Sequence, residues 1–143
     1  MSFNYFNIEY AIKEHDFIIN ESGGKHGINN LGLLESVLEH IQNDLYYPEF
    51  ETKLTHLVFS INKNHAFSDG NKRSSIALGS YFLEINGLGY CIDKFIIEME
   101  NISVHIADNR IDKDLLHEIV FSIITENEFN ETLKLKIIDA ISF

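Results

Sequence analysis

The densest group of side chains that could carry out chemistry lies in one short stretch that begins at His65. His65 is a base that titrates near neutral pH, and Asp69 is a hard oxygen ligand of the kind that suits Mg²⁺. Gly70 lets the backbone turn and approach a ligand closely. Lys72 and Arg73 bring positive charge, and arginine can bind phosphate oxygens through two N–H groups at once. A base, a metal ligand and two cations together are typical of a phosphoryl- or nucleotidyl-transfer site.

A helix is expected to position these groups. Residues 76–85 have the composition of a helix, and Asn86-Gly87 is a helix-stop signal. The stretch therefore reads as a loop that opens onto a helix N-terminus. There the first backbone N–H groups have no partner within the helix and the dipole is positive, which favours an anion.

Two further residues of the stretch have expected roles. Asn71 can donate or accept hydrogen bonds through its amide, and Phe67 is expected to anchor the loop in the core. The alternative interpretation is an ordinary turn and helix cap, with Lys72 and Arg73 on a solvated first turn. Because cations at a helix N-terminus oppose the dipole, their presence favours the interpretation with a bound anion.

The nine residues from His65 to Arg73 resemble the signature of the Fic/Doc family. Their sequence, His-Ala-Phe-Ser-Asp-Gly-Asn-Lys-Arg, corresponds to the pattern H-x-F-x-[DE]-[AG]-N-[KG]-R. Lys72 is similar to the Doc (death-on-curing) toxin branch, since the adenylylating Fic branch usually has Gly there. That branch also has a second Arg, where this chain has Ile76. Gly70 suits both branches, and Ala66 departs from the Pro of many members.

A second segment supports the resemblance. The residues from His15-Asp16 to Gly23-Gly24, followed by residues 26–36, resemble the first helix and the flap of Doc. By resemblance the flap positions the target segment, and its residues are Lys25, His26, Gly27 and Ile28. The alternative is an ordinary connector. His15 lies on the apolar face of the first helix and is expected to be a core or capping histidine rather than a ligand. The resemblance covers about residues 5–125.

The resemblance implies an activity and partners. His65 would deprotonate a Ser or Thr hydroxyl of a protein target, and Asp69 would hold Mg²⁺, with Asn71 as a candidate second ligand. Lys72, Arg73 and the backbone of Gly70 and Asn71 would bind the phosphates of ATP. The implied target is elongation factor Tu, the outcome is arrested translation, and a small antitoxin protein would neutralise the toxin.

The reaction type is the open question at this point. Lys72 beside Arg73 should gather the terminal phosphates at the helix start, which favours transfer of the γ-phosphate. Ile76 cannot bind the terminal phosphates as the second Arg does in adenylylating relatives. The alternative is a Fic-type AMP transferase, and a third interpretation is a non-catalytic interaction module that keeps the fold.

Composition limits the other functions. The chain has 143 residues, 45% of them hydrophobic, which is enough for one core. A formal net charge of -11 argues against general nucleic-acid binding and favours a basic partner surface. The single cysteine, Cys91, excludes an intrachain disulfide and fits a reducing compartment. No signal peptide and no membrane-length apolar run is apparent, so we expect a cytoplasmic protein with no membrane partner.

Apolar spacing predicts an all-α fold, a Fic/Doc-like helical bundle of six or seven helices with a small flap hairpin or loop. The expected helices span about residues 8–20, 31–43, 51–64, 76–85, 93–106, 112–123 and the tail. We expect one domain over residues 1–143, with a core of about 5–125 and a helical tail at 126–143. The run Ser122–Asn127 resembles the inhibitory [ST]-x-x-x-E-[GN] pattern of Fic proteins. Because the Arg that pairs with its Glu is absent here, we expect a chance match.

Overall fold

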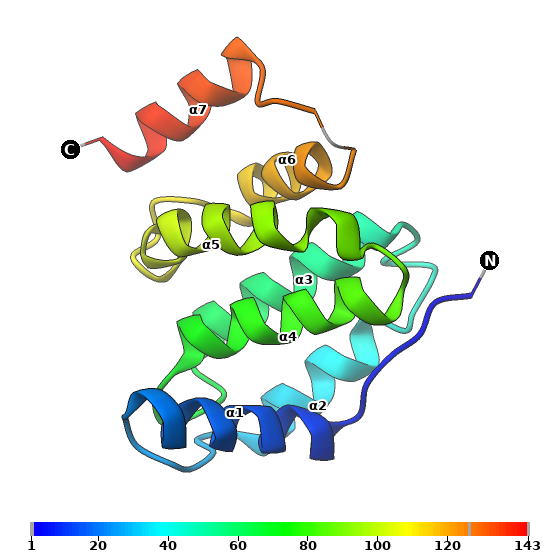
Figure 1. Cartoon of the computed structure of the whole chain (residues 1–143), viewed down its shortest axis with the longest axis vertical. Coiled ribbons are helices and arrows are strands. Elements are labelled where there is room, and N and C mark those ends of the chain that lie inside the picture. The colour runs from blue at the N-terminus through cyan, green and yellow to red at the C-terminus, as the bar shows by residue number, and fades with distance from the viewer. Residues whose placement is uncertain (1, 126, 143) are drawn as a thin grey trace.

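The computed structural model describes residues 2–125 and 127–142, and over these residues the fold is all-α, as predicted (Figure 1). The described residues contain no β-structure except one isolated bridge between Ile28 and Phe67. The elements are α1 (Ile8–Ser22), α2 (Leu31–His40), α3 (Phe50–Asn64), α4 (Asn71–Ile85), the 3₁₀ turn η1 (Gly89–Cys91), α5 (Ile92–Ala107), α6 (Lys113–Ile124) and α7 (Glu131–Ile141). The segment between α1 and α2 is a loop rather than a hairpin.

Helix α3 is the centre of the fold. It packs against α2, α4, α5 and α6, and every side chain from Lys53 to Val58 is buried. Its apolar residues at helical spacing, Leu54, Leu57, Val58 and Ile61, are all buried. A helix that is buried on all sides lies inside a core. The C-terminal end of α3, where His65 follows, is therefore held firmly from several directions.

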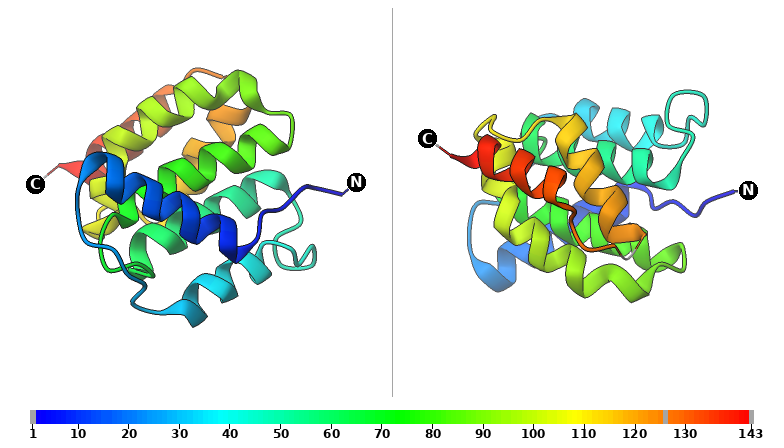
Figure 2. Two further views of the ribbon diagram at one scale, coloured as in Figure 1. Left: turned by 60° about the horizontal axis from the view of Figure 1, so that its bottom comes forward. Right: turned by 90° about the horizontal axis from the view of Figure 1, so that it is seen from above.

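The helices lie in successive layers along the longest axis of the molecule (Figures 1 and 2). Helices α1 and α2 occupy one end, α3 and α4 the middle, and α5, α6 and finally α7 the other end. Gly79 allows the middle layers to approach closely. A Cβ atom at Gly79 would lie 2.8 Å from Phe95 Cζ and 2.9 Å from Val58 Cγ2. Only glycine fits at this crossing of α4 with α3 and α5.

Side chains define several helix boundaries. The side-chain oxygens of Asn7, Asn30, Asp112 and Asn130 accept a hydrogen bond from the N–H group three residues later. Such N-caps satisfy donors that have no partner within the helix.

Helix α2 ends at His40, three residues before the predicted Asn43. The buried Lys53 explains this end, because its Nζ donates to the Ile41 carbonyl at 2.6 Å and to Asp44 Oδ1 at 2.7 Å. The lysine thus takes the place of the next helical turn as the partner of that carbonyl.

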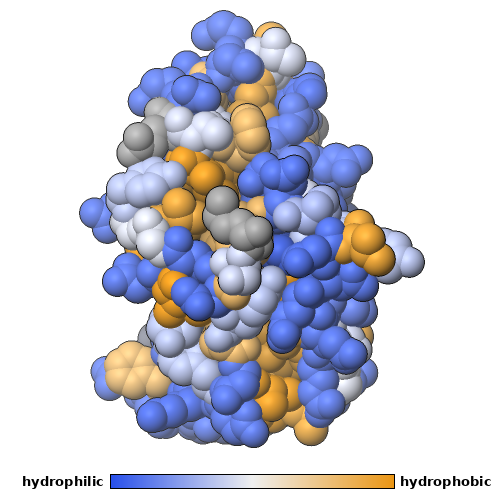
Figure 3. All heavy atoms as spheres, turned by 90° about the vertical axis from the view of Figure 1, so that its right-hand side faces the viewer, coloured by the Kyte–Doolittle hydropathy of each residue, from blue (hydrophilic) through white to orange (hydrophobic). Residues whose placement is uncertain are grey.

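The predicted C-terminal helix is present as α7, which packs on α6 and buries Leu133. Two of its apolar residues, Leu135 and Ile138, are exposed. No helix of the described residues is long and apolar enough to cross a membrane. The face seen from the right-hand side of Figure 1 is mostly hydrophilic with separate apolar patches (Figure 3).

Candidate active site

Residues 65–70 form the loop between α3 and α4, here called the motif loop, at the lower left of Figure 1. Both of its ends have left-handed backbone conformations. His65 has φ 50° and ψ 51°, and Gly70 has φ 73° and ψ 23°. Glycine adopts such angles readily, whereas for another residue they cost roughly 1–2 kcal/mol. Because strained backbone of this kind is concentrated at functional sites, His65 is marked as a candidate by its conformation as well as its chemistry.

Phe67 anchors the motif loop, and Asn71 fixes its shape. Phe67 is fully buried. The Asn71 side chain accepts a hydrogen bond from the Phe67 N–H at 3.0 Å and donates one to the Phe67 carbonyl at 2.9 Å. The side-chain amide, a candidate second Mg²⁺ ligand beside Asp69, is therefore engaged within the loop. The backbone N–H of Asn71, at the start of α4, is the group that remains available to a ligand.

His15 supports the loop from α1. Its ring lies parallel to that of Phe67, with centroids 4.0 Å apart and an angle of 3°. Its Nε2 lies 2.6 Å from the Asp69 carbonyl. Because a carbonyl oxygen can only accept, Nε2 carries the hydrogen. His15 is a buried core histidine, as predicted. Its contact with the motif loop was not predicted. The only signal for it in the sequence is one polar residue in an otherwise apolar stripe.

Asp69 presents an ionised carboxylate beside the flap. Its Oδ1 accepts from the Gly70 N–H at 2.8 Å, and its Oδ2 accepts from the Lys25 N–H at 3.1 Å. The N–H group of Lys25, then that of Gly70, holds the pKa of the Asp69 carboxyl below its ordinary value, and the positive charges of Arg73 and Lys25 add to this. The carboxylate is partly exposed, so it can still bind a cation.

The flap, residues 23–30, runs antiparallel to the motif loop. Ile28 pairs with Phe67, and on either side the Ser68 N–H donates to the Gly27 carbonyl at 3.0 Å and the Asn29 N–H donates to the Ala66 carbonyl at 2.9 Å. The two sequence segments that carry the family resemblance are therefore joined by main-chain hydrogen bonds.

Individual flap residues differ in what they contact. Gly24 has φ 124°, and a Cβ atom there would lie 2.7 Å from Asp69 Oδ2. Glycine is thus required where the flap passes the carboxylate. His26 is turned towards α1, where its ring nitrogens lie 3.2 Å from Asp16 Oδ1 and 2.9 Å from Asn20 Oδ1. Among the flap residues, the backbone of Lys25 is the part that touches Asp69.

Arg73 links the start of α4 to the end of α1. Its Nη1 donates to Ser22 Oγ and, at 2.9 Å, to the Gly23 carbonyl. Its Nη2 faces two glycines, because Cβ atoms built at Gly24 and Gly70 would lie 3.2 and 3.3 Å from it. The guanidinium group is thus held in a space that any larger residue at either glycine would fill.

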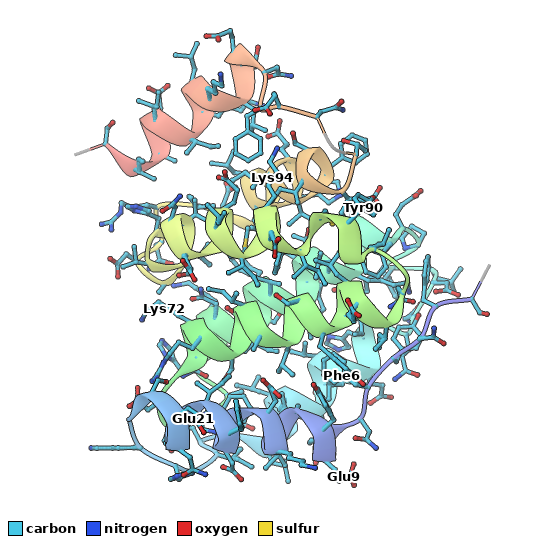
Figure 4. The ribbon with its side chains drawn as sticks, in the orientation of Figure 1. Phe6, Glu9, Glu21, Lys72, Tyr90 and Lys94 are labelled. Carbon is cyan, nitrogen blue, oxygen red and sulfur yellow. The ribbon has the colours of Figure 1, made fainter. Side chains whose placement is uncertain are left out.

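The N-terminus of α4 is open. Gly70 is its N-cap and makes no side-chain cap, and the first hydrogen bond of the helix runs from the Ser74 N–H to the Gly70 carbonyl at 2.9 Å. The N–H groups of the first turn are therefore available, and the helix dipole makes this end positive. Lys72 is exposed there and extends away from the ribbon (Figure 4). An anion would meet N–H groups and two cations together.

His65 is the C-cap of α3 and the first residue of the motif loop. Its side chain is exposed, and no hydrogen bond among the described residues engages its ring. Its carbonyl accepts a hydrogen bond from Asn29 Nδ2 at 3.4 Å, which ties its backbone to the flap. The imidazole can therefore accept a proton from an incoming group without breaking a contact.

The comparisons with known proteins agree with this geometry. The sequence model of the Fic/DOC family matches residues 5–83, more than half of the chain. The chain belongs to the Fic/Doc family. It is 32% identical over 96 residues to the toxin Doc of Mycolicibacterium smegmatis (strain ATCC 700084 / mc(2)155), an alignment that covers 64% of this chain and 74% of that protein. The predicted membership of the Fic/Doc family is confirmed, and the relative supports the Doc branch.

The pattern that resembles the inhibitory motif of Fic proteins is described only in part. Its acidic residue, Glu126, lies outside the described residues. Ser122 and Asn127 bond to each other at the end of α6, where Ser122 Oγ donates to the Asn127 carbonyl at 3.0 Å and the Asn127 N–H donates to the Ser122 carbonyl at 3.1 Å. Among the described residues, no hydrogen bond joins this turn to the motif loop.

Proposed function

We propose that this protein is a Doc-like toxin that transfers the γ-phosphate of ATP to a Ser or Thr hydroxyl of a protein target. The observation that carries the proposal is the open N-terminus of α4, which meets Lys72 and Arg73 on one side and the ionised Asp69 on the other. His65 stands on the same loop with an unengaged ring. Phosphoryl transfer depends on positioning and on charge stabilisation more than on covalent chemistry, and these groups supply both.

His65 is the proposed general base. It would accept the proton of the target hydroxyl as that oxygen attacks the γ-phosphorus, while the bond from the γ-phosphorus to the bridging oxygen breaks and ADP leaves. Its exposure suits this role because the target hydroxyl belongs to another protein and must reach the ring. The flap would align the target segment, since its main chain already pairs with the motif loop.

Arg73, Lys72 and the first N–H groups of α4 are the proposed phosphate ligands. The fork of Arg73 is oriented by its bonds to Ser22 and Gly23, so little side-chain freedom is lost when phosphate binds. Lys72 is exposed and acts as a mobile point charge on the terminal phosphates. Asn71 would contribute its backbone N–H, with its side chain holding the loop in shape.

Asp69 is the proposed magnesium ligand. No group of three or more His, Cys, Asp or Glu side chains in the described part of the chain could hold a metal by itself. A partly exposed carboxylate with a lowered pKa nevertheless fits Mg²⁺, which often takes one or two carboxylates together with substrate phosphates. When bound, the ion would neutralise charge on the phosphates of ATP.

Lys72 and Ile76 favour phosphate over AMP as the group transferred. Ile76 is half-buried and lines a groove together with Arg73, so an apolar side chain lies where adenylylating relatives carry a second Arg. Without that second cation, the terminal phosphates have their strongest partners at Lys72, Arg73 and the α4 N-terminus. This distribution of charge supports the proposal that the γ-phosphate, rather than the α-phosphate, lies beside His65.

The deciding experiment uses purified protein, elongation factor Tu as the proposed target, Mg²⁺ and ATP labelled at either the γ or the α position. The proposal expects γ label on the target, no α label, and a mass gain of one phosphate. Label from the α position would make the protein an AMP transferase. If neither label transfers to this target or to proteins of a bacterial extract, the chain is a non-catalytic module.

The toxin role has its own test. Expression of the chain is expected to arrest bacterial growth and translation, and co-expression of a small antitoxin protein to relieve the arrest. A His65→Asn variant at matched expression is the control, because asparagine tolerates the left-handed backbone but cannot act as a base. Arrest by this variant would separate toxicity from phosphate transfer and refute the proposed mechanism.

A further inference from the structure

A second cluster of titratable side chains lies away from the motif loop. His40 ends α2, His56 lies in the middle of α3, and Lys113 begins α6. His56 precedes His65 by nine residues, which is about 13 Å along a helix. The proposed phosphate transfer uses none of these groups, so the cluster needs an explanation of its own.

The three side chains form a directional chain of hydrogen bonds. Lys113 Nζ lies 2.7 Å from His56 Nδ1, and His56 Nε2 lies 3.1 Å from His40 Nδ1. When the lysine donates to Nδ1, the neutral ring of His56 carries its hydrogen on Nε2 and donates it to His40. His40 is exposed. The chain thus leads from an amine, through a buried imidazole, to solvent.

The surroundings favour the neutral forms of His56 and Lys113. The ring of Tyr47 stacks on that of His56 with centroids 4.4 Å apart, and His56 is buried. Burial lowers the pKa of His56 to about 4, and the neighbouring Lys113 and His40 add to the effect. Burial also lowers the pKa of Lys113, against an opposing effect of Asp114. The amine is therefore more often unprotonated than that of an exposed lysine.

Lys113 also borders a cavity of about 370 Å³. The cavity is lined by Tyr46, Tyr47, Thr52, Thr55, Lys113, Asp114 and His117. His56 is not among the lining residues, so Lys113 is the member of the hydrogen-bonded chain that borders this cavity. Because one N–H of the tetrahedral amine is directed to His56, the lone pair of the neutral amine can face the cavity. A volume of this size suits a small molecule.

We propose that Lys113 is a covalent site for neutral carbonyl compounds, aldehydes in particular, with His56 as the base that serves its amine. Two tyrosine rings and two threonine hydroxyls suit a flat molecule with a polar carbonyl. The Asp114 carboxylate in the lining and the net charge of -11 disfavour anionic reagents. The site is independent of the proposed phosphate transfer.

The reaction is an imine formation without any oxidation or reduction. The lone pair of Lys113 Nζ forms a bond to the carbonyl carbon, and the π electrons of the carbonyl move to its oxygen. His56 Nδ1 takes the proton that the attacking nitrogen loses, while His40 accepts a hydrogen bond from Nε2 of the resulting imidazolium. The proton is returned to the oxygen, which gives a carbinolamine. The second proton of the nitrogen then passes through His56 to the hydroxyl, the carbon–oxygen bond breaks, water leaves, and a carbon–nitrogen double bond remains. Desolvated lysines react with carbonyl compounds in this way.

The test compares two lysines within the same full-length protein. Benzaldehyde is the neutral probe, cyanoborohydride reduces the imine to a stable amine, and peptide mass spectrometry follows each lysine. Lys13 is the internal control because it is exposed on α1. General-base assistance contributes on the order of 10²–10⁴ in rate, and the lowered pKa of His56 places its effect at the low end, so we expect Lys113 to be modified about 10²-fold faster than Lys13. Equal rates, or a slower rate at Lys113, would overturn the proposal.

Variants separate the base from the cavity. His56→Gln keeps a hydrogen-bonding side chain but cannot take up a proton, and it should bring the rate at Lys113 down towards that of Lys13, whose own rate stays unchanged. If burial of the glutamine prevents folding, judged by circular dichroism, His40→Gln at the exposed end of the chain takes its place and should slow Lys113 severalfold. An unchanged Lys113 rate in the folded variant would refute the role of His56 as base. Lys113→Arg should abolish the adduct.

Discussion

The Asn71→Ala substitution should show how much of the site's stability depends on the shape of the motif loop. In the wild type both polar atoms of the Asn71 amide bond to the backbone of Phe67. Phe67 faces Ile28 in the isolated bridge, but the bridge hydrogen bonds are made by Ala66 and Ser68. The N–H and carbonyl of Phe67 therefore point away from the flap, towards Asn71. Alanine leaves both groups without that partner.

The expected loss follows from these two bonds. A hydrogen bond contributes about 0.5–1.5 kcal/mol, and a buried group left unsatisfied costs about 1–3 kcal/mol. Asn71 is 8% exposed and Phe67 is 0% exposed, so water has little access to the freed groups. Two such groups lead us to expect a loss of about 2–4 kcal/mol in the free energy of unfolding. Phosphate transfer should fall as well, because Asp69 and Gly70 lie between the two bonded residues.

Urea unfolding followed by circular dichroism measures this loss. With a slope of about 2 kcal/mol per M urea, the middle of the usual range, the midpoint should fall by about 1–2 M at an unchanged slope. Asn29→Ala is the matched control. Asn29 is exposed, and its side-chain contacts, to the His65 carbonyl at 3.4 Å and to Ser68 Oγ at 3.3 Å, are long. The control should stay within about 0.5 kcal/mol of the parent. Equal stability of the two variants would refute the account of Asn71.

Three further outcomes are expected. His65→Asn should lower the rate of the proposed transfer to the target by about 10²–10⁴. It should leave the thermal midpoint unchanged, since the ring is exposed and has no hydrogen bond among the described residues. Transfer near the parent rate would exclude His65 as the base. Asp69→Asn should be less stable than the parent at neutral pH. Because the pKa of Asp69 is lowered in the folded protein, this difference should close as the pH falls through and below its ordinary value of 3.8, and a constant gap in urea midpoints would contradict the assigned hydrogen bonds. Gly24→Ala should weaken Mg²⁺-dependent ATP binding in calorimetry much more than Gly23→Ala. Both positions have positive φ, but only at Gly24 would the new Cβ meet Asp69, at 2.7 Å, so equal effects would point to backbone strain alone.

Much of the helical framework was predictable because helix formation is governed by local periodicity. The stripe of α3 and the caps Asn30 and Asp112 lie in the sequence within a few residues of the groups that they serve. The features that local periodicity does not predict have non-local causes. The end of α2 depends on Lys53, which reaches back twelve residues to the Ile41 carbonyl. The exposure of Leu135 on α7 depends on how little of α6 that helix covers, which periodicity does not contain.

The residues of the site could also be predicted from the sequence, because most of them lie in one continuous segment from His65 to Arg73. The nine residues identified the family and the chemical groups available. They did not indicate that the amide of Asn71 is engaged by Phe67, since a loop conformation, rather than a residue type, brings the two together.

By itself, the sequence determined the helices, the motif loop and the identity of the groups that could bind phosphate. Only the tertiary structure decided which distant groups meet them. His15 reaches the Asp69 carbonyl across 54 residues, and the Lys25 N–H reaches the Asp69 carboxylate across 44. Lys113 reaches His56 across 57 residues. Such pairs depend on how the helices pack around α3, and packing is set by the combined shape of many side chains. Hydrophobic spacing specifies which face of each helix is buried, but not which polar group it will meet there.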